Sequence, residues 1–270
     1  MDELPPSIDR SRPSVARIYD WLLGGSANFA VDREAAQKVV AELTSMPLMA
    51  RLNRSFLRRA VRYLVEQGID QFLDLGSGIP TAGNVHEIAQ AASPDARVVY
   101  VDVDPVAVNH ARHLLADDPN ATAVHADLRD VDTVLLEATT LLDFTRPIGL
   151  LLAAILPFIP DADDPSGIID RYLSTLVPGS YLALSHGTND QADNFGGALA
   201  AYNNSVMRVT LRSHAELLDL LHGVDLVEPG LVWTTEWRPD GRDPQLASGH
   251  EAGTWAAVGQ LRKPTLPPPS

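Results

Sequence analysis

The chain has 270 residues, of which 45% are hydrophobic, so it is long enough to bury one large core. It contains no cysteine, which excludes disulfides, thiolate metal sites and a cysteine nucleophile. Its formal charge of −14 disfavours a nucleic-acid substrate, because Lys and Arg supply most of the affinity for phosphate backbones. The polar start of the chain does not resemble a secretory signal, and the longest apolar run, residues 148–159, is shorter than the roughly 20 residues of a membrane helix. We therefore expect a cytoplasmic protein.

The first 66 residues are predicted to form a helical extension that caps the rest of the chain. Three helices are expected there, over residues 15–23, 32–43 and 51–66. Apolar residues line one face of the third helix, and five arginines lie mostly on the other face: Arg51, Arg54, Arg58, Arg59 and Arg62. We interpret these arginines as a solvated face in preference to an RNA-contacting surface.

From residue 67 onward, strands and helices alternate. Strands are expected over residues 71–75, 97–102, 121–125, 148–155 and 181–185, and helices over residues 84–92, 105–116, 131–142 and 165–176. Strands joined by crossover helices of this length form a parallel sheet with right-handed connections. The sequence therefore predicts a doubly wound α/β domain over residues 67–262.

The alternation ends after the fifth strand. Residues 186–206 are polar and rich in Asn, so we expect a long loop that is either a functional lid or disordered. A helix over 213–221 and two strands over 230–237 and 254–261 follow, and the two strands are expected to close the sheet as an antiparallel pair. These make seven strands in all. The Pro-rich residues 263–270 are predicted to be a disordered tail.

The segment FLDLGSGIPT, residues 72–81, predicts a ligand site, because an apolar strand runs into a glycine-rich turn before a helix. Asp74 would repel a pyrophosphate at this turn and attract a ligand that carries an ammonium and a sulfonium. Residues 69–109 contain one basic residue, Arg97, among six acids, which also favours a cationic ligand.

Two further acids follow the next two strands. Asp102 ends the second strand, where a carboxylate can accept hydrogen bonds from both hydroxyls of a ribose. Asp127 follows the third strand and is expected to receive an adenine amino group, with Leu128 against the base. Each acid also has a structural interpretation: Asp102 in a strand-end turn with Pro105, and Asp127 as a helix N-cap.

Five segments together resemble the actinobacterial S-adenosyl-L-methionine-dependent methyltransferase family. They are SVARIYDWLLGGSANFAVDREAA, DLGSGIPTAGNVHEIA, VVYVDVDPVAVNHAR, HADLRD and AILPFIPDAD, which begin at residues 14, 74, 98, 125 and 154. The resemblance implies a Rossmann-like methyltransferase sheet of seven strands with an antiparallel last hairpin. It also implies S-adenosyl-L-methionine as the cofactor.

The resemblance assigns cofactor contacts to eight residues. The methionine part would be held by Asp74, Gly76, Ser77 and Gly78, the ribose and the adenine edge by Asp102 and Val103, and the adenine by Asp127 and Leu128. Two departures stand out. Pro80 occupies the position of a third glycine in the wider methyltransferase pattern, and Pro157 stands where the family often has a histidine, which removes one candidate base.

Methyl transfer depends mainly on positioning and a dry, electrostatically suitable site, and a general base is optional. Tyr19, Asn28 and His186 are our candidate catalytic residues, with Asp20 and Tyr202 as further groups near the expected pocket. Ordinary packing is an equally good interpretation of Tyr19, and His186 also fits a satisfied strand-end histidine. No acid and histidine cluster has metal-ligand spacing, so no metal is expected.

The predicted function is therefore methyl transfer to an unidentified small molecule. We expect the enzyme to act in secondary metabolism and the chain to form a homodimer. The alternative is a cofactor-binding regulatory protein without transfer activity. Two other functions are less favoured. Asp74 and the lack of basic residues oppose a nicotinamide-dependent oxidoreductase, and the net charge opposes an RNA methyltransferase.

Overall fold

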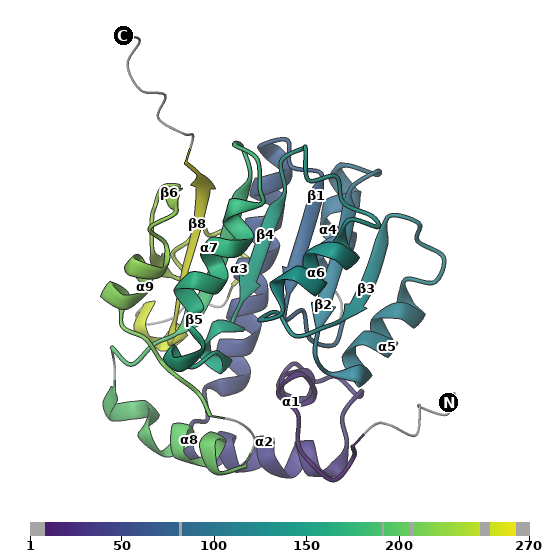
Figure 1. The fold of residues 1–270 in the computed structure, drawn as a ribbon. Coiled ribbons are helices and arrows are strands. Elements are labelled where there is room, and N and C mark those ends of the chain that lie inside the picture. Colours follow the sequence, from purple (N-terminus) through teal and green to yellow (C-terminus); the bar gives the residue numbers. More distant parts are fainter. Residues whose placement is uncertain (1–8, 81–82, 191, 206–207, 244–248, 263–270) are drawn as a thin grey trace.

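The computed structural model describes residues 9–80, 83–190, 192–205, 208–243 and 249–262, and a single mixed sheet forms the centre of this part (Figure 1). The strand order is β3-β2-β1-β4-β5-β8-β6, and β7 pairs with β8 beside this path. The strands are β1 Gln71–Leu75, β2 Arg97–Asp102, β3 Ala121–His125, β4 Gly149–Ala153, β5 Tyr181–Gly187, β6 Val224–Leu226, β7 Val232–Trp233 and β8 Thr254–Leu261.

Helices cover both faces of the sheet and one of its ends (Figure 1). The α-helices are α1 Val15–Leu22, α2 Ala30–Glu42, α3 Met46–Glu66, α4 Val85–Ala92, α5 Pro105–Leu114, α6 Val131–Ala138, α7 Pro165–Ser174, α8 Ala192–Ser205 and α9 His214–Leu220. Three short 3₁₀ helices are η1 Leu156–Phe158, η2 Asp161–Asp163 and η3 Gly249–Ala252. Helices α1, α2 and α8 lie at the end of the sheet to which the parallel strands point (Figure 1).

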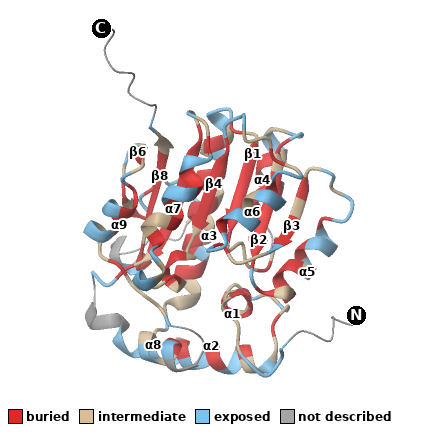
Figure 2. Cartoon of the chain, viewed as in Figure 1, coloured by how far each residue is buried: buried red, intermediate tan, exposed pale blue. Residues whose placement is uncertain are grey.

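The central parallel strands β1, β2, β4 and β5 are almost entirely buried, and β3, at the edge of the sheet, is partly exposed (Figure 2). In the register of the central strand, Leu73 of β1 lies opposite Val99 of β2 and Leu150 of β4. Every residue of β1 is buried, as expected for a parallel strand with helices on both faces. Residues of α6, α7 and α9 pack on one face, and residues of α3, α4 and α5 pack on the other. The predicted doubly wound fold is confirmed.

The antiparallel end of the sheet differs in detail from the prediction. Strand β8 pairs antiparallel with β5, β6 and β7, and β6 was not predicted because its three residues give too short a pattern. The expected strand over 230–237 is reduced to Val232 and Trp233. The chain turns there, because the backbone N–H groups of Glu236 and Trp237 both donate to the Trp233 carbonyl, at 2.8 and 3.2 Å.

The interpretation of residues 186–206 as a loop was wrong, since α8 occupies Ala192–Ser205. Its Asn and Gly residues have low helix propensity, which concealed the helix in the sequence. In the structure α8 lies against α2, and tertiary contact of this kind stabilises helices whose intrinsic propensity is weak.

The arginine face of the third helix is not simply solvated. Arg59 is 4% exposed, and its Nε donates to the Trp237 carbonyl at 2.9 Å. Its other guanidinium nitrogens bond the Thr234 carbonyl and the carboxylate of Asp243. Arg58 pairs with Asp240 at 3.1 Å. These arginines attach the segment after β7 to α3, which was not foreseen because their partners lie far away in the sequence.

The division of the chain at residue 66 stays a prediction. Helix α3, which precedes the division, packs directly on the sheet through residues such as Phe56 and Leu64. The predicted tail, residues 263–270, lies outside the described residues.

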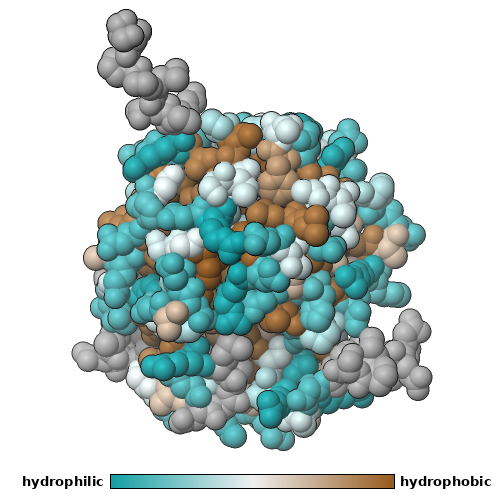
Figure 3. All heavy atoms as spheres, viewed as in Figure 1, coloured by the Kyte–Doolittle hydropathy of each residue, from teal (hydrophilic) through white to brown (hydrophobic). Residues whose placement is uncertain are grey.

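Hydrophilic side chains cover much of the face seen in Figure 3, with smaller apolar areas between them. None of the helices that the structure describes is both long and apolar enough to cross a membrane.

Candidate functional site

The loop that follows β1 is fixed against β2. The backbone N–H groups of Gly76 and Ser77 donate to the Val101 carbonyl at 2.8 and 3.0 Å. Gly76 has a φ of 68°, and a Cβ atom there would overlap the side chain of Ile155. Gly78 has the same φ but faces open space. Glycine at both positions allows the left-handed turn; it makes room for Ile155 at Gly76 and leaves the backbone open to a ligand at Gly78.

Asp74 is a buried carboxylate without a partner. It is 3% exposed, and it forms no hydrogen bond or ion pair with any residue that the structure describes. Burial raises the pKa of Asp74 to about 7; the positive charge of Arg54 lowers this pKa and the negative charge of Asp102 raises it. A strongly perturbed carboxyl group in a concave site is typical of a group that meets a ligand.

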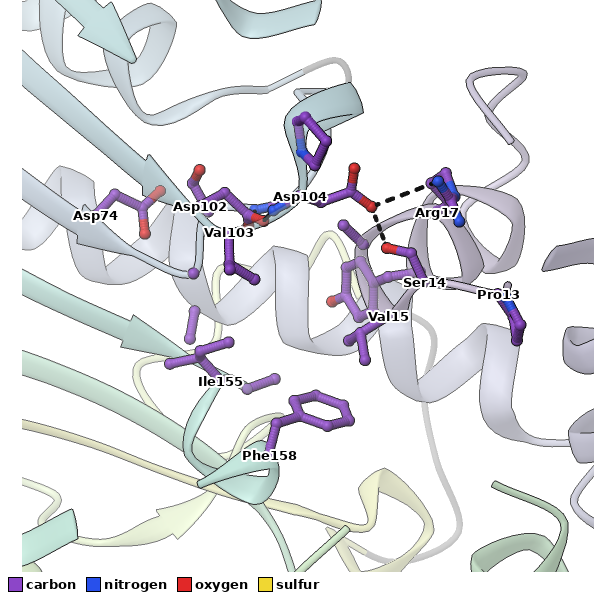
Figure 4. Close-up of a pocket in the computed structure, with 18 of the residues that line it drawn as sticks. Pro13, Ser14, Val15, Arg17, Asp74, Asp102, Val103, Asp104, Ile155 and Phe158 are labelled. Atoms are coloured by element: carbon purple, nitrogen blue, oxygen red, sulfur yellow. Dashed lines mark hydrogen bonds and ion pairs between the residues drawn. The ribbon is translucent and has the colours of Figure 1, made fainter. Parts of the chain in front are cut away.

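Asp102, at the end of β2, lies beside Asp74 in the close-up (Figure 4). Its two carboxylate oxygens accept hydrogen bonds from the backbone N–H groups of Gly78 and Asp104, at 2.7 and 2.8 Å. Burial raises the pKa of Asp102 to about 6, while these two hydrogen bonds lower it. The loop after β1 and the end of β2 are therefore joined through this carboxylate.

The N-terminal segment is held over these strand ends by Asp104, which caps α5 by accepting the Val106 N–H at 2.7 Å. The hydroxyl of Ser14 donates to the same carboxylate, and the guanidinium of Arg17 lies 3.9 Å from it (Figure 4). Arg17 also pairs with the buried Asp32 at 3.0 Å. A buried charge with two carboxylate partners fixes the position of α1 above the sheet.

A cavity of about 460 Å³ opens between the strand ends and this segment. Its walls combine the ends of β1 and β2, the segment after β4 and the N-terminal helices, including Asp74, Gly76, Ser77, Gly78, Asp102, Val103, Ile155, Phe158, Ser14, Tyr19, Asn53 and Arg54. Val103 is 60% exposed, and its side chain and that of Ile155 both line the cavity (Figure 4). Both side chains give the cavity wall apolar surface.

Six of the eight cofactor residues expected from the sequence line this cavity, and Asp127 and Leu128 are not among its described walls. Asp127 binds the guanidinium of Arg129, whose hydrogen bonds hold the pKa of this carboxyl below its usual value. Arg129 also pairs with Asp163 at 2.7 Å. Leu128 is buried in the core, and its carbonyl accepts the Tyr172 hydroxyl at 2.7 Å.

Of the candidate catalytic residues, Tyr19 lines the cavity. Its hydroxyl donates to the Ala50 carbonyl at 3.1 Å and accepts from the Asn53 side-chain amide at 2.9 Å. The Asn53 oxygen in turn accepts the Ser185 hydroxyl at 2.5 Å. Burial raises the pKa of Tyr19, so the phenol is neutral at neutral pH. This chain of hydrogen bonds connects α1, α3 and β5.

Asn28 stabilises the Gly-Gly turn of the N-terminal segment. Its amide donates to Asp20 at 2.8 Å and to the Gly25 carbonyl at 3.0 Å, and its oxygen accepts from Arg33 at 3.1 Å. A Cβ atom on Gly25 would overlap the Asp20 carboxylate. Glycine is thus required where this acid approaches the backbone. Neither Asn28 nor Asp20 is among the described walls of the cavity.

His186 is completely buried, with 0% exposure. Its Nδ1 lies 2.6 Å from the Gly187 carbonyl, and its Nε2 lies 2.9 Å from a guanidinium nitrogen of Arg212. Burial lowers the pKa of His186 to about 3, so the ring is neutral and its Nε2 accepts from Arg212. His186 is absent from the described walls of the cavity.

Sequence reasoning did not assign Arg54, Asn53 or Phe158 to the site. Arg54 was interpreted as part of a solvated face, and nothing in the helical pattern separates it from its neighbours. Phe158 belongs to the AILPF segment, which was a sufficient signal, because residues that follow a parallel strand reach the ligand edge of the sheet. Within the described residues, no group of three or more potential metal ligands lies together.

The sequence matches the family described as S-adenosyl methyltransferase over residues 1–262. The chain belongs to this family. It is therefore an S-adenosyl-L-methionine-dependent methyltransferase, and the predicted family, activity and cofactor are confirmed.

Two solved structures are similar to this methyltransferase over almost its whole length. A DUF574 family protein from Streptomyces avermitilis MA-4680 is 40% identical, with a TM-score of 0.90, and the match covers 94% of this chain and 99% of that one. A protein from Thermobifida fusca YX, provisionally named a methyltransferase, is 38% identical with a TM-score of 0.91, and the match covers 97% and 100%. No curated protein matches the sequence.

Proposed function

We propose that this methyltransferase binds S-adenosyl-L-methionine in the cavity at the ends of β1 and β2 and methylates a small molecule. The observation that carries the proposal is Asp74, a buried carboxylate that lines the cavity and forms no ion pair with any residue that the structure describes. The ammonium group of the cofactor supplies such a partner. The cavity volume of about 460 Å³ is also in the range of small-molecule sites.

The charges of the cavity match the amino-acid part of the cofactor. Asp74 would pair with the ammonium, and Arg54 would pair with the carboxylate, because both side chains line the same cavity. The open space beside Gly78 lets this zwitterion approach the backbone of the turn. Arg54 acts on Asp74 already, since its positive charge lowers the pKa of that carboxyl.

The other end of the cavity suits a nucleoside. Asp102 would accept the ribose hydroxyls, while its hydrogen bonds from Gly78 and Asp104 hold the carboxylate in place. Val103 and Ile155 would pack on the adenine. A contact from Asp127 or Leu128 to the adenine stays a prediction, and it requires that Arg129 release the Asp127 carboxylate.

When bound, the cofactor supplies an electrophilic methyl group on a sulfonium. The chain contributes position and exclusion of water, since α1 is held over the strand ends by Ser14 and Arg17. The acidic side chains favour the positive charge before transfer. Tyr19 would orient the acceptor as a neutral hydrogen-bonding group, a role that needs no general base. Asn28 and His186 would act indirectly: Asn28 would stabilise the Gly-Gly turn of the N-terminal segment, and His186 would stabilise the end of β5.

A cofactor-binding regulatory protein without transfer activity is the second candidate. It is favoured by the engagement of Tyr19 and His186, whose polar atoms are bonded within the protein. Conversion of S-adenosyl-L-methionine to S-adenosyl-L-homocysteine in the presence of acceptor candidates separates the two functions. Acceptor-dependent turnover would exclude the regulatory candidate.

The cofactor site is tested by calorimetric titration with S-adenosyl-L-methionine, S-adenosyl-L-homocysteine and NAD. We expect micromolar binding of the first two, loss of more than about tenfold in affinity in Asp102→Ala, and no binding of NAD. Asp95→Asn, a change at an exposed acid, is the matched control and should bind normally. Preference for NAD, or full affinity in Asp102→Ala, would contradict the proposal.

We also propose that the enzyme is cytoplasmic, acts in secondary metabolism and forms a homodimer that binds no nucleic acid. The acidic sequence supports the last point. Light scattering after size exclusion tests the assembly, because the chain mass is 29.2 kDa and a dimer would have twice that mass.

A further inference from the structure

A second cavity, of about 150 Å³, adjoins the cofactor cavity. Five residues line both of them: Val15, Tyr19, Asn53, Ala154 and Phe158. Beyond this shared wall, the second cavity is lined by α1, α2, α3, α8, the start of β8, the end of β5 and the segments after β4 and before α9. We call this second cavity the chamber. A molecule in it would lie next to the occupant of the cofactor cavity, and both would contact these five residues.

The chamber differs from the cofactor cavity in charge. None of its described walls is an ionisable acid or base with a charge at neutral pH, whereas Asp74, Asp102 and Arg54 line the cofactor cavity. Most of its side chains are apolar, and Met46 and Met49 add flexible ones. An ionised ligand would lose its hydration here without gaining a partner, which is strongly unfavourable.

Tyr202 gives the chamber one polar group without a partner. The side chain is 9% exposed, and its ring lies against Phe158 with the centroids 5.8 Å apart. Its hydroxyl forms no hydrogen bond with any described residue, although the residue lines the chamber. Burial raises the pKa of Tyr202, so this hydroxyl is neutral and can both donate and accept.

The size of the chamber limits what can enter it. An apolar cavity of about 150 Å³ can hold one benzene ring. The flexible methionines allow small differences in shape, but a large fused ring system would have to extend into the cofactor cavity. The chamber therefore fits an apolar body of about one ring.

We infer that the chamber is the methyl-acceptor site, and that it takes a neutral molecule with a ring-sized apolar body and one hydroxyl group. The inference rests on the proposed function. In the transfer, the acceptor oxygen forms a bond to the methyl carbon while the carbon–sulfur bond breaks, and the electron pair of that bond goes to sulfur. The proton of the acceptor hydroxyl passes to water, which leaves the methyl ether and S-adenosyl-L-homocysteine.

The test compares three probes that share one ring: benzyl alcohol, benzoate and benzylammonium. Their binding is measured by saturation-transfer NMR on the full chain saturated with S-adenosyl-L-homocysteine. Benzyl alcohol should bind at least tenfold more tightly than either ion. Val209→Trp fills the chamber from a residue that does not line the cofactor cavity, so it should abolish this binding and retain that of S-adenosyl-L-homocysteine.

Tyr202→Phe keeps the ring and removes only the hydroxyl. It should weaken benzyl alcohol about two- to tenfold and leave toluene unchanged, as expected for the loss of one hydrogen bond. If Val209→Trp does not fold, Tyr202→Phe still tests whether benzyl alcohol binds in the chamber.

Equal binding of an ion and the alcohol, or no binding of benzyl alcohol to protein that binds S-adenosyl-L-homocysteine, would overturn the inference alone. Failure to bind S-adenosyl-L-homocysteine at all would overturn the proposed function with it.

Discussion

Replacing Asp74 by Asn should stabilise the free protein and at the same time remove its affinity for the cofactor. Asn has nearly the same shape as Asp but carries no charge, so it relieves the burial of an unpaired carboxylate. It also leaves the ammonium of S-adenosyl-L-homocysteine without a counter-ion. We expect the affinity to fall by about tenfold to a hundredfold, as for a charged hydrogen bond of about 1.5–3 kcal/mol.

The size of the stabilisation follows from the pKa of Asp74. This pKa is about 7 in the folded protein, against an ordinary value of 3.8. Because one pKa unit corresponds to about 1.36 kcal/mol, the ionised carboxylate lowers the free energy of unfolding by up to about 4 kcal/mol. The pKa is raised on folding, so this loss is absent below about pH 4, grows between pH 4 and 7 and is complete above pH 7.

Urea unfolding between pH 4 and 8 measures the effect directly. The free energy of unfolding of Asp74→Asn should exceed that of the original protein by about 2–4 kcal/mol at pH 8 and should be similar at pH 4. Asp95→Asn, at an exposed position, should track the original protein throughout. If Asp74→Asn were less stable at pH 8, or if the difference did not depend on pH, Asp74 would not be an unpaired buried carboxylate and the argument for the cofactor site would fail.

Two further substitutions test the site and its support. Arg54→Met should weaken S-adenosyl-L-homocysteine about tenfold in calorimetry through loss of the carboxylate partner, and Arg51→Met, at an exposed position of the same helix, should not. Equal affinities would remove Arg54 from the site. Gly25→Ala should lower the free energy of unfolding by about 1–3 kcal/mol, because its Cβ would overlap Asp20. Gly196→Ala has open space and should raise that free energy by up to about 1 kcal/mol, so a loss of similar size in both variants would contradict the steric explanation.

The parallel part of the sheet was predictable because each strand is a short apolar run that ends at a turn. Strands β1, β2 and β3 have the predicted bounds, and the acids Asp74 and Asp102 reach the cavity because parallel strands end at one edge. The alternation of apolar runs and turns depends only on residues that are close in the sequence. Local sequence patterns were therefore sufficient to predict these strands and the acids at their ends.

The rest depends on contacts between distant segments, which a local pattern does not contain. Helix α8 has a weak helical sequence and lies against α2. Arg59 resembles its exposed neighbours on α3, yet it is buried because the segment around Trp237 covers it. Arg54 also resembles its neighbours on α3. It lines the cofactor cavity because the ends of β1 and β2 lie opposite it, and the helical pattern contains no information about those strands.

One turn of α1 connects the two cavities. Val15 and Tyr19 are four residues apart and therefore lie on one face of the helix, where they line both the cofactor cavity and the chamber. Arg17, on another face, fixes the same turn to Asp32 and Asp104. The acids on one side of this wall attract a cation, and the apolar side excludes ions. The two reactants would therefore bind in different cavities according to their charge: the sulfonium at the strand ends and the neutral acceptor in the chamber. The methyl group would be transferred where the two cavities meet, beside the residues that line both.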